Sequence, residues 1–299
     1  MTLSSFWRGV LPAITTPFNA DGSVDHAFLA EHARQLVAAG CIGMVPLGSL
    51  DEAATLSFDE KLAVMRTLVD ALDVPVIPGI ASLSTAEAVR LAREAKAIGC
   101  RGLMVLPAYV YSTDWREMGA HAHAVLDATD LPCMLYNNPP AYTTDFLPAQ
   151  IAELAAAHAN LEAVKESSTD VRRITAIRHL VGARLNLLVG IDDVVVEGVA
   201  AGATGWIAGL VNAFPKESVR LFELARAGDM AAADRLYHWF LPLLRMDTGP
   251  RFVQLIKLVQ QQVGMGSERV RAPRLALADD ERAQALQVIE HALATRPEV

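Results

Sequence analysis

A lysine at the end of a short apolar run has the clearest chemical potential in this sequence. Lys165 follows Leu161-Glu162-Ala163-Val164 and precedes the polar turn Glu166-Ser167-Ser168. A buried ammonium is costly unless it is paired or loses its proton, and a neutral lysine amine can form a Schiff base with a carbonyl. The alternative is that this side chain reaches out of the strand to pair with Glu166. The other lysines fall in helical or helix-edge patterns: Lys61, Lys96, Lys216 and Lys257.

Schiff-base chemistry also requires a proton shuttle and donors that hold the substrate carboxylate. Tyr136 ends an earlier apolar run and can move protons, and the hydroxyls of Ser49 and Tyr109 could relay them. The small-residue turn Gly48-Ser49-Leu50 has backbone N–H groups that could bind a carboxylate. All these residues follow apolar runs, so a parallel barrel would bring them to one end.

Other polar residues near these runs are expected to be structural. We expect Glu52 and Glu166 to form ion pairs, and Asp192-Asp193 to cap the helix that follows them. His121 and His123 are two positions apart on a helix, so they face different ways and make a poor metal pair. The strand ends therefore lack the convergent ligands that a metal-dependent aldolase needs.

The elements that would position these residues are short apolar runs separated by helical patterns. Copies of Gly-x-x-Gly followed by an apolar run begin at Gly40, Gly99 and Gly202, each after a helical pattern. This unit predicts a helix ended by a glycine, a tight loop and a buried parallel strand. Eight runs are recognised: residues 10–15, 42–47, 75–79, 103–106, 133–136, 161–165, 186–190 and 205–208.

Eight strands alternating with helices predict a (βα)8 TIM barrel over residues 1–225. Helices are expected between the runs, for example over residues 25–39, 58–72 and 85–98, with Ser84 as an N-cap. Residues 226–299 are predicted to form a C-terminal helical extension. Its amphipathic patterns cover residues 221–244, 252–263 and 279–294. A doubly wound open sheet is the alternative, but no Gly-x-Gly-x-x-Gly follows the first run.

Composition narrows the class of protein further. The chain has 299 residues, of which 52% are hydrophobic, and a formal net charge of −8. The hydrophobic fraction suffices for a large core, and the acidic balance argues against nucleic acid or an anionic membrane as a partner. Cys41, Cys100 and Cys133 are expected to be reduced core thiols of a cytoplasmic protein. Neither a signal peptide nor a membrane-spanning run is recognised.

Three segments together resemble the dihydrodipicolinate synthase / N-acetylneuraminate lyase family. Residues 48–56, Gly-Ser-Leu-Asp-Glu-Ala-Ala-Thr-Leu, are similar to its Gly-Thr-Thr-Gly-Glu-x-x-x-Leu loop. Leu135-Tyr136-Asn137-Asn138-Pro139 resembles its Tyr-Asn-x-Pro strand end. Val164-Lys165-Glu166-Ser167-Ser168 resembles its Lys-Glu-(Ala/Ser)-(Ser/Thr) strand. The order and spacing of these motifs match over the whole chain.

The resemblance implies a homotetrameric (βα)8 lyase, a dimer of dimers, that uses no metal and no organic cofactor. It implies that Lys165 condenses with pyruvate or another 2-oxo acid and that Tyr136 shuttles protons. Ser49 would stand where the family has its relay threonine, and Tyr109 would reach into a neighbouring subunit. Aldol cleavage or condensation, dehydration and deamination all remain open.

The resemblance further implies that backbone groups of Ser49, Leu50 and Ile207 bind the substrate carboxylate. Two positions depart from the family pattern. Leu50 replaces the second loop threonine, and Ala141 stands where the lysine-pathway synthases have an arginine for the aldehyde partner. The missing guanidinium removes a bidentate contact, which favours an uncharged distal end over 4-hydroxy-tetrahydrodipicolinate synthesis. Because both changes remove polar groups, a catalytically silent barrel that binds a 2-oxo acid is the second hypothesis.

Overall fold

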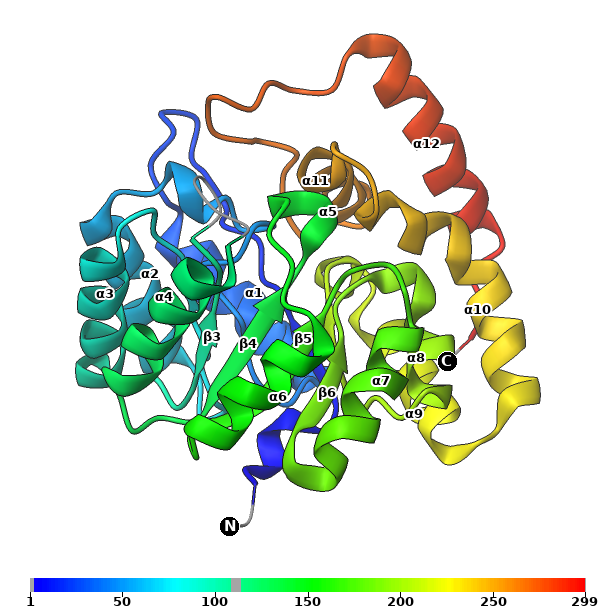
Figure 1. The fold of residues 1–299 in the computed structure, drawn as a ribbon. Coiled ribbons are helices and arrows are strands. Elements are labelled where there is room, and N and C mark those ends of the chain that lie inside the picture. The colour runs from blue at the N-terminus through cyan, green and yellow to red at the C-terminus, as the bar shows by residue number, and fades with distance from the viewer. Residues whose placement is uncertain (1–2, 109–113, 299) are drawn as a thin grey trace.

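The computed structural model describes residues 3–108 and 114–298 and shows one parallel sheet surrounded by helices (Figure 1). The sheet has seven strands in the order β1-β7-β6-β5-β4-β3-β2. Their bounds are β1 (Val10–Pro12), β2 (Gly79–Ile80), β3 (Leu103–Val105), β4 (Cys133–Asn137), β5 (Leu161–Glu166), β6 (Asn186–Val189) and β7 (Gly205–Ala208). The first and last strands are neighbours, so the sheet curls around and brings the two ends of the repeat together.

The run at residues 42–47 is not a strand, which corrects one of the eight predicted strands. It forms two isolated parallel bridges instead, Ala13 with Val45 and Met44 with Val76. The strand predicted at residues 75–79 is also reduced, to β2. Prolines at positions 46, 75 and 78 explain both differences, because proline lacks the N–H group that a regular ladder requires.

Helices follow the strands around the sheet. They are α1 (His26–Ala38), α2 (Phe58–Ala71), α3 (Thr85–Ile98), α4 (Trp115–Asp127), α6 (Pro148–Ala157), α7 (Arg172–Val181), α8 (Val195–Ala200) and α9 (Pro215–Ala227). A short helix, α5 (Pro139–Tyr142), follows β4 directly. Gly40, Gly99 and Gly202, which begin the repeated motif, all have φ values near +105° (106°, 106° and 104°), as expected for glycines that end helices. Ser84 lies at the N-cap of α3, but its side chain makes no capping hydrogen bond.

The C-terminal part contains α10 (Met230–Leu244), α11 (Phe252–Gln262) and α12 (Asp279–Ala294). The single helix predicted over residues 221–244 is wrong, because α9 ends at Gly228 with φ 76°. Asp229 then begins α10, and its side chain accepts a hydrogen bond from the Ala232 N–H. A left-handed glycine followed by an Asp N-cap separates two helices, although the apolar pattern continues through the break.

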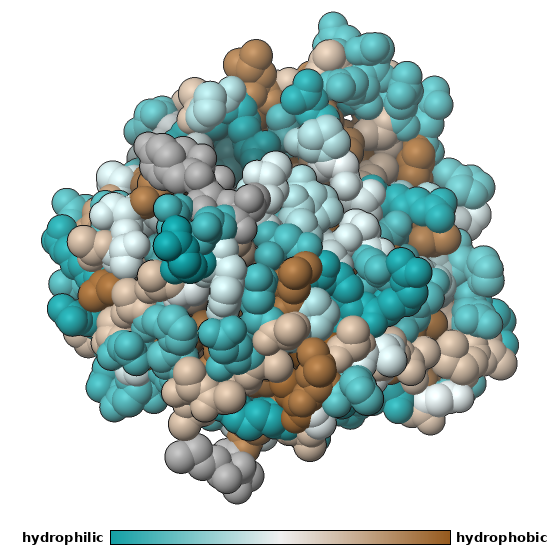
Figure 2. All heavy atoms as spheres, in the orientation of Figure 1, coloured by the Kyte–Doolittle hydropathy of each residue, from teal (hydrophilic) through white to brown (hydrophobic). Residues whose placement is uncertain are grey.

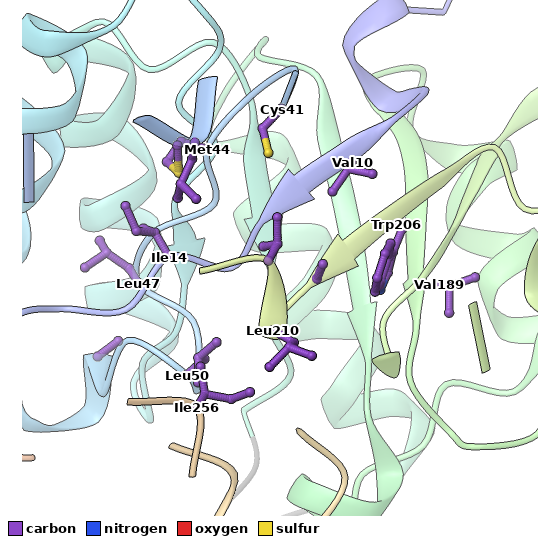
Figure 3. Packing of buried hydrophobic residues seen from close by; sticks show 14 of the residues in the cluster. Val10, Ile14, Cys41, Met44, Leu47, Leu50, Val189, Trp206, Leu210 and Ile256 are labelled. Atoms are coloured by element: carbon purple, nitrogen blue, oxygen red, sulfur yellow. The ribbon is translucent and has the colours of Figure 1, made fainter. Parts of the chain in front are cut away.

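Buried side chains form two clusters, one inside the curled sheet and one between the strands and the helices. The inner cluster includes Tyr136 and Ile207. The outer cluster contains Leu50 and Leu210, from segments after strand ends, together with Ile256 of α11 (Figure 3). The helix α11 therefore packs against the end of the sheet where the predicted site lies.

The surface drawn in Figure 2 is mainly hydrophilic, with hydrophobic side chains in small separate groups. Within residues 3–108 and 114–298, no helix has the length and apolar character needed to cross a bilayer. All three cysteines are buried and unpaired, as predicted.

Candidate active site

Adjacent strands place Lys165 beside Tyr136. The two residues are register partners of β4 and β5, and Lys165 Nζ lies 4.1 Å from the centroid of the Tyr136 ring. Lys165 is only 6% exposed. Within the described residues its amine makes no hydrogen bond and no ion pair. The alternative that Lys165 pairs with Glu166 is therefore wrong, and the amine is left beside an aromatic ring.

Within the described residues, the hydroxyl of Ser49 is joined to a tyrosine that was not part of the predicted relay. Ser49 Oγ is hydrogen-bonded to the Tyr142 hydroxyl, and the Tyr142 ring packs edge-on against Tyr136 with centroids 5.8 Å apart. The Tyr136 hydroxyl accepts a hydrogen bond from Asn138 Nδ2 at 2.8 Å. Tyr109, the other predicted relay residue, lies outside the described residues. The structure thus brings Ser49 to Tyr142, a tyrosine that the sequence analysis did not select.

A local sequence signal could have identified Tyr142. Asn138 follows β4 and caps α5 by accepting a hydrogen bond from the N–H of Ala141. Prolines at the first two positions of this helix suit a helix start. Asn-Pro-Pro directly after a strand therefore predicts a tight turn that carries the next tyrosine back over the strand end.

The turn at Gly48-Ser49-Leu50 has unused backbone donors. Within the part of the chain that the structure describes, the N–H groups of Ser49 and Leu50 donate no hydrogen bond. Leu47, which precedes the turn, has a left-handed backbone with φ 62°, and its N–H donates to the carboxyl of Asp51. Two amides without an acceptor in one turn are donors suited to a carboxylate.

Glu52 and Glu166 form ion pairs, as predicted. Glu52 Oε1 lies 2.5 Å from Lys257 Nζ, and both side chains are almost completely buried. Glu166 lies 3.6 Å from Arg173 Nε and accepts the side-chain amide of Asn137 at 3.2 Å. Burial raises the pKa of Glu166, and its hydrogen bonds and Arg173 oppose this shift. The first pair connects the turn after residues 42–47 to α11, and the second connects the end of β5 to α7.

Asp192 does not cap the helix after it, which corrects the prediction. The structure shows no capping hydrogen bond from Asp192-Asp193 to α8. The Asp192 carboxyl instead accepts hydrogen bonds from Trp206 Nε1 at 3.0 Å, Gly209 N at 3.1 Å and Leu210 N at 2.7 Å. Burial raises its pKa to about 6, while those donors and the nearby charge of Lys165 oppose the shift. Asp192 therefore holds the turn that follows β7.

Asp247 is a second carboxyl beside Lys165 that the sequence analysis missed. It lies in a 3-10 helix, Arg245–Asp247, between α10 and α11. A Cβ atom on Gly209 would lie only 2.4 Å from Asp247 Oδ1, so the glycine leaves the room that this carboxyl occupies. Burial and the charge of Asp192 raise the pKa of Asp247 well above its ordinary value, and Lys165 opposes this. No strand-end pattern marks Asp247, because it comes from the C-terminal helices.

A cavity of about 950 Å³ opens beside these residues. Its walls include Gly48, Ser49, Ala141 and Tyr142. Tyr142 links this lining to Lys165, because it packs against the Tyr136 ring over which Lys165 Nζ lies. The side chains of Leu50 and Ile207, two of the predicted substrate-binding residues, are buried. Any contact of these two residues with a ligand would therefore involve their backbone groups.

The histidines do not form a metal site. His121 Nδ1 is hydrogen-bonded to Thr85, whereas His123 Nδ1 contacts His158 Nε2 at 2.5 Å. Their different partners confirm that the two rings face different ways. Among residues 3–108 and 114–298, no group of three or more His, Cys, Asp or Glu side chains is arranged to hold a metal ion.

Known proteins resemble this chain over nearly its whole length. The model of the dihydrodipicolinate synthetase family matches residues 6–292. The 4-hydroxy-tetrahydrodipicolinate synthase of Methanothrix thermoacetophila is 32% identical over 287 residues, which cover 95% of this chain and 96% of the relative. The enzyme of the same name from Haloarcula marismortui is 34% identical over 94% of this chain and 92% of its own.

Solved structures show the same relationship. YagE of Escherichia coli K12, a prophage protein of the dihydrodipicolinic acid synthase family solved in complex with pyruvate, matches with a TM-score of 0.90 and 28% identity. The match covers 96% of this chain and 99% of YagE. Dihydrodipicolinate synthase DapA-2 of Bacillus anthracis matches with a TM-score of 0.90 and 26% identity, over 95% of this chain and 98% of its own. This chain belongs to the dihydrodipicolinate synthetase family and is a lyase of that family.

Proposed function

We propose that Lys165 forms a Schiff base with a small 2-oxo acid, and that Tyr136 moves the protons of the reaction. The observation that carries this proposal is a buried amine that lies 4.1 Å from the Tyr136 ring centroid. It has no ion pair within the described residues. An amine that is not committed to a carboxylate can attack a carbonyl once it has lost its proton.

The reaction begins when Lys165 Nζ attacks the ketone carbon, C2, of the substrate. The carbonyl oxygen takes one proton from Nζ and one delivered by Tyr136 and leaves as water, so a protonated C=N bond to Nζ remains. When the C3–C4 bond breaks, the C=N bond accepts its electron pair, and the C4 hydroxyl loses its proton to become an aldehyde. Protonation at C3 and addition of water then release the amine and the shorter 2-oxo acid. Loss of a proton from C3 instead allows a hydroxyl or amine to leave C4. Lyases that cleave a C–C bond and lyases that eliminate water or ammonia therefore share the steps up to the Schiff base.

The polar groups around the amine suit these steps. The Tyr136 ring lies against the amine, and Ser49 with Tyr142 connects this ring to the cavity. The free amides of Ser49 and Leu50 supply donors for the C1 carboxylate. YagE was solved with pyruvate, which supports a pyruvate-type 2-oxo acid here. Ala141 stands where a 4-hydroxy-tetrahydrodipicolinate synthase would have an arginine for its aldehyde partner, so we propose that the partner of the pyruvate-type acid differs from that aldehyde.

Borohydride reduction in the presence of pyruvate tests the proposal. The wild-type chain should gain one reduced adduct, mapped by peptide mass analysis to the peptide that contains Lys165. Lys165→Arg should remain folded and gain none. Lys96→Arg, on the exposed side of α3 and paired with Asp130, is the matched control and should label normally. An adduct on another lysine, or none in the wild type, would overturn the assignment.

We also propose that residues 42–47 close the sheet into a (βα)8 barrel over residues 1–225, with residues 226–299 as its helical extension. The bridges of Val45 and Met44 support closure. We further propose a cytoplasmic homotetramer, built as a dimer of dimers. Light scattering should then give four times the chain mass of 32.2 kDa, and a monomer mass would contradict it.

A further inference from the structure

The cavity beside Ser49 is larger than a three-carbon acid requires. Its volume of about 950 Å³ lies near the upper end of the roughly 300–1,000 Å³ typical of small-molecule sites. Its lining includes Ser49 and Tyr142, and also Arg251 and Arg274 from the C-terminal part, together with the carboxylates Glu52 and Glu281. In Figure 1, the segment between α11 and α12 passes over the end of the sheet where α5 lies. The cavity therefore extends from the proposed catalytic hydroxyls to two guanidinium groups.

Arg274 belongs to a group of charges in which cations outnumber anions. Its Nε lies 4.0 Å from Glu52 Oε2. That oxygen already accepts the backbone N–H of Arg271 at 3.0 Å, and Glu52 Oε1 is bound by Lys257 Nζ at 2.5 Å. The buried Glu52 carboxylate thus faces two cationic side chains. Its contact with Lys257 is shorter than its contact with Arg274.

Neighbouring carboxyls do not balance this excess. Burial raises the pKa of Asp51 well above its ordinary value, which favours the neutral form of this carboxyl. Glu60 is held at 2.7 Å by the guanidinium of Arg271. Burial lowers the pKa of Lys257 against the attraction of Glu52, and the charge of Arg274 adds to the lowering. Since its contact with the Glu52 carboxylate is as long as 4.0 Å, the guanidinium of Arg274 brings an incompletely balanced positive charge to the cavity lining.

Arg251 supplies a second guanidinium to the lining of the cavity. Its nearest carboxylate oxygen, Glu281 Oε1, is 3.5 Å from Nε, beyond the roughly 2.7–2.9 Å of a charge-assisted hydrogen bond. The two side chains are 57% and 42% exposed, and such exposed pairs contribute little to stability. Arg251 can therefore exchange Glu281 for the carboxylate of a ligand.

We propose that Arg274 and Arg251 form an anion subsite that binds a second carboxylate of the substrate, at the end remote from the ketone. The substrate class is then a 2-oxo dicarboxylic acid. This inference rests on the proposed function, because Lys165 must hold the ketone end. The planar guanidinium suits a carboxylate, which it binds through two parallel hydrogen bonds. The cation missing at Ala141 is thus supplied from the C-terminal segment, and the expectation of an uncharged distal end is replaced.

Matched pairs of 2-oxo acids test the subsite. Borohydride trapping would be titrated with 2-oxoglutarate and 2-oxoadipate, and with 2-oxopentanoate and 2-oxohexanoate, which have the same chain lengths but no second charge. In the wild type, the dicarboxylic acids should reach half-maximal labelling of Lys165 at a concentration at least tenfold lower. Arg274→Gln and Arg251→Gln should reduce this preference at least fivefold each. Labelling by pyruvate should stay within twofold of the wild type.

Controls separate this inference from the chemistry on which it rests. Arg282→Gln, on α12 and paired with Glu268, lies outside the cavity wall and should keep the full preference. Arg274→Lys keeps the positive charge without the planar guanidinium and should retain part of the preference for dicarboxylic acids. This variant also controls for the possibility that Arg274→Gln loses the preference because it misfolds. Equal labelling by charged and uncharged acids in the wild type, or a preference unchanged in both glutamine variants, would overturn the subsite. Absence of any pyruvate adduct would instead overturn the Schiff-base proposal.

Discussion

Ser49 and Tyr142 share a hydrogen bond between their hydroxyl groups, although 93 positions separate them in the chain. Ser49 lies in the turn after the run at residues 42–47, and Tyr142 ends the short helix α5 after β4. Tyr142 also packs edge-on against Tyr136. The pair thus joins the cavity wall to the tyrosine ring that lies against Lys165, and it adds Tyr142 to the proposed proton relay.

Removing either hydroxyl of this pair should slow turnover. We expect Tyr142→Phe and Ser49→Ala each to lower kcat about tenfold or more, because general acid–base groups contribute roughly 10²- to 10⁴-fold. Since the two groups act through one hydrogen bond, the double variant should be no slower than the slower single variant. Steady-state kinetics on the three variants would check this. Multiplicative losses would show that the hydroxyls act independently.

The Tyr136 hydroxyl should matter for turnover but not for the fold. Tyr136→Phe keeps the ring beside Lys165 and removes only the hydroxyl that accepts from Asn138. We expect kcat to fall by about 10²- to 10⁴-fold, while borohydride still traps a pyruvate adduct on Lys165 after longer incubation. Unchanged kcat in this variant would remove Tyr136 from the mechanism.

Gly190 should be essential for the position of the amine. A Cβ atom there would lie 2.6 Å from Lys165 Cε and 2.0 Å from Ser167 Oγ, so Gly190→Ala must displace Lys165. We expect pyruvate labelling to fall at least tenfold, whereas circular dichroism still reports a folded chain. Gly249→Ala is the matched control, because a Cβ atom on Gly249 has no neighbour within 4 Å among the described residues. Normal labelling of Gly190→Ala would contradict the packing described.

Stability should fall in mild acid because of His32. This buried histidine lies between Asn212 and Gln260, and burial, opposed by the Asn212 hydrogen bond, lowers its pKa from 6.5 to about 4. As the pH falls, His32 takes up a proton in the unfolded chain before it does so in the folded chain. The stability that comes from burying the neutral imidazole is therefore fully present above pH 6.5 and is lost as the pH falls toward 4. Linkage gives a loss of about 2 kcal/mol at pH 5.

Urea unfolding at pH 7.5 and pH 5 would measure this effect. His32→Gln removes the titrating group, so its free energy of unfolding should change less between the two pH values than that of the wild type, by about 2 kcal/mol. An identical pH dependence in both proteins would mean that other groups cause the acid sensitivity.

Much of the fold was predictable because it depends on local pattern. The strands after Gly99 and Gly202 were predicted to within one residue of their observed bounds, since apolar runs bounded by glycines leave few alternatives. The errors occurred where local chemistry opposed that pattern. Prolines interrupted the run at residues 42–47, and a left-handed Gly228 divided a continuous amphipathic stretch into α9 and α10.

The sequence by itself determined which chemistry is available, because Lys165 and Tyr136 both end buried runs and parallel neighbours must bring such ends together. Only the tertiary structure decided which groups surround them. Asp192 proved to hold a turn rather than a helix, and Asp247 and Arg274 reach the site from helices and segments far along the chain. Side chains that meet through the packing of distant elements leave no periodic signal in the sequence, whereas residues at strand ends do.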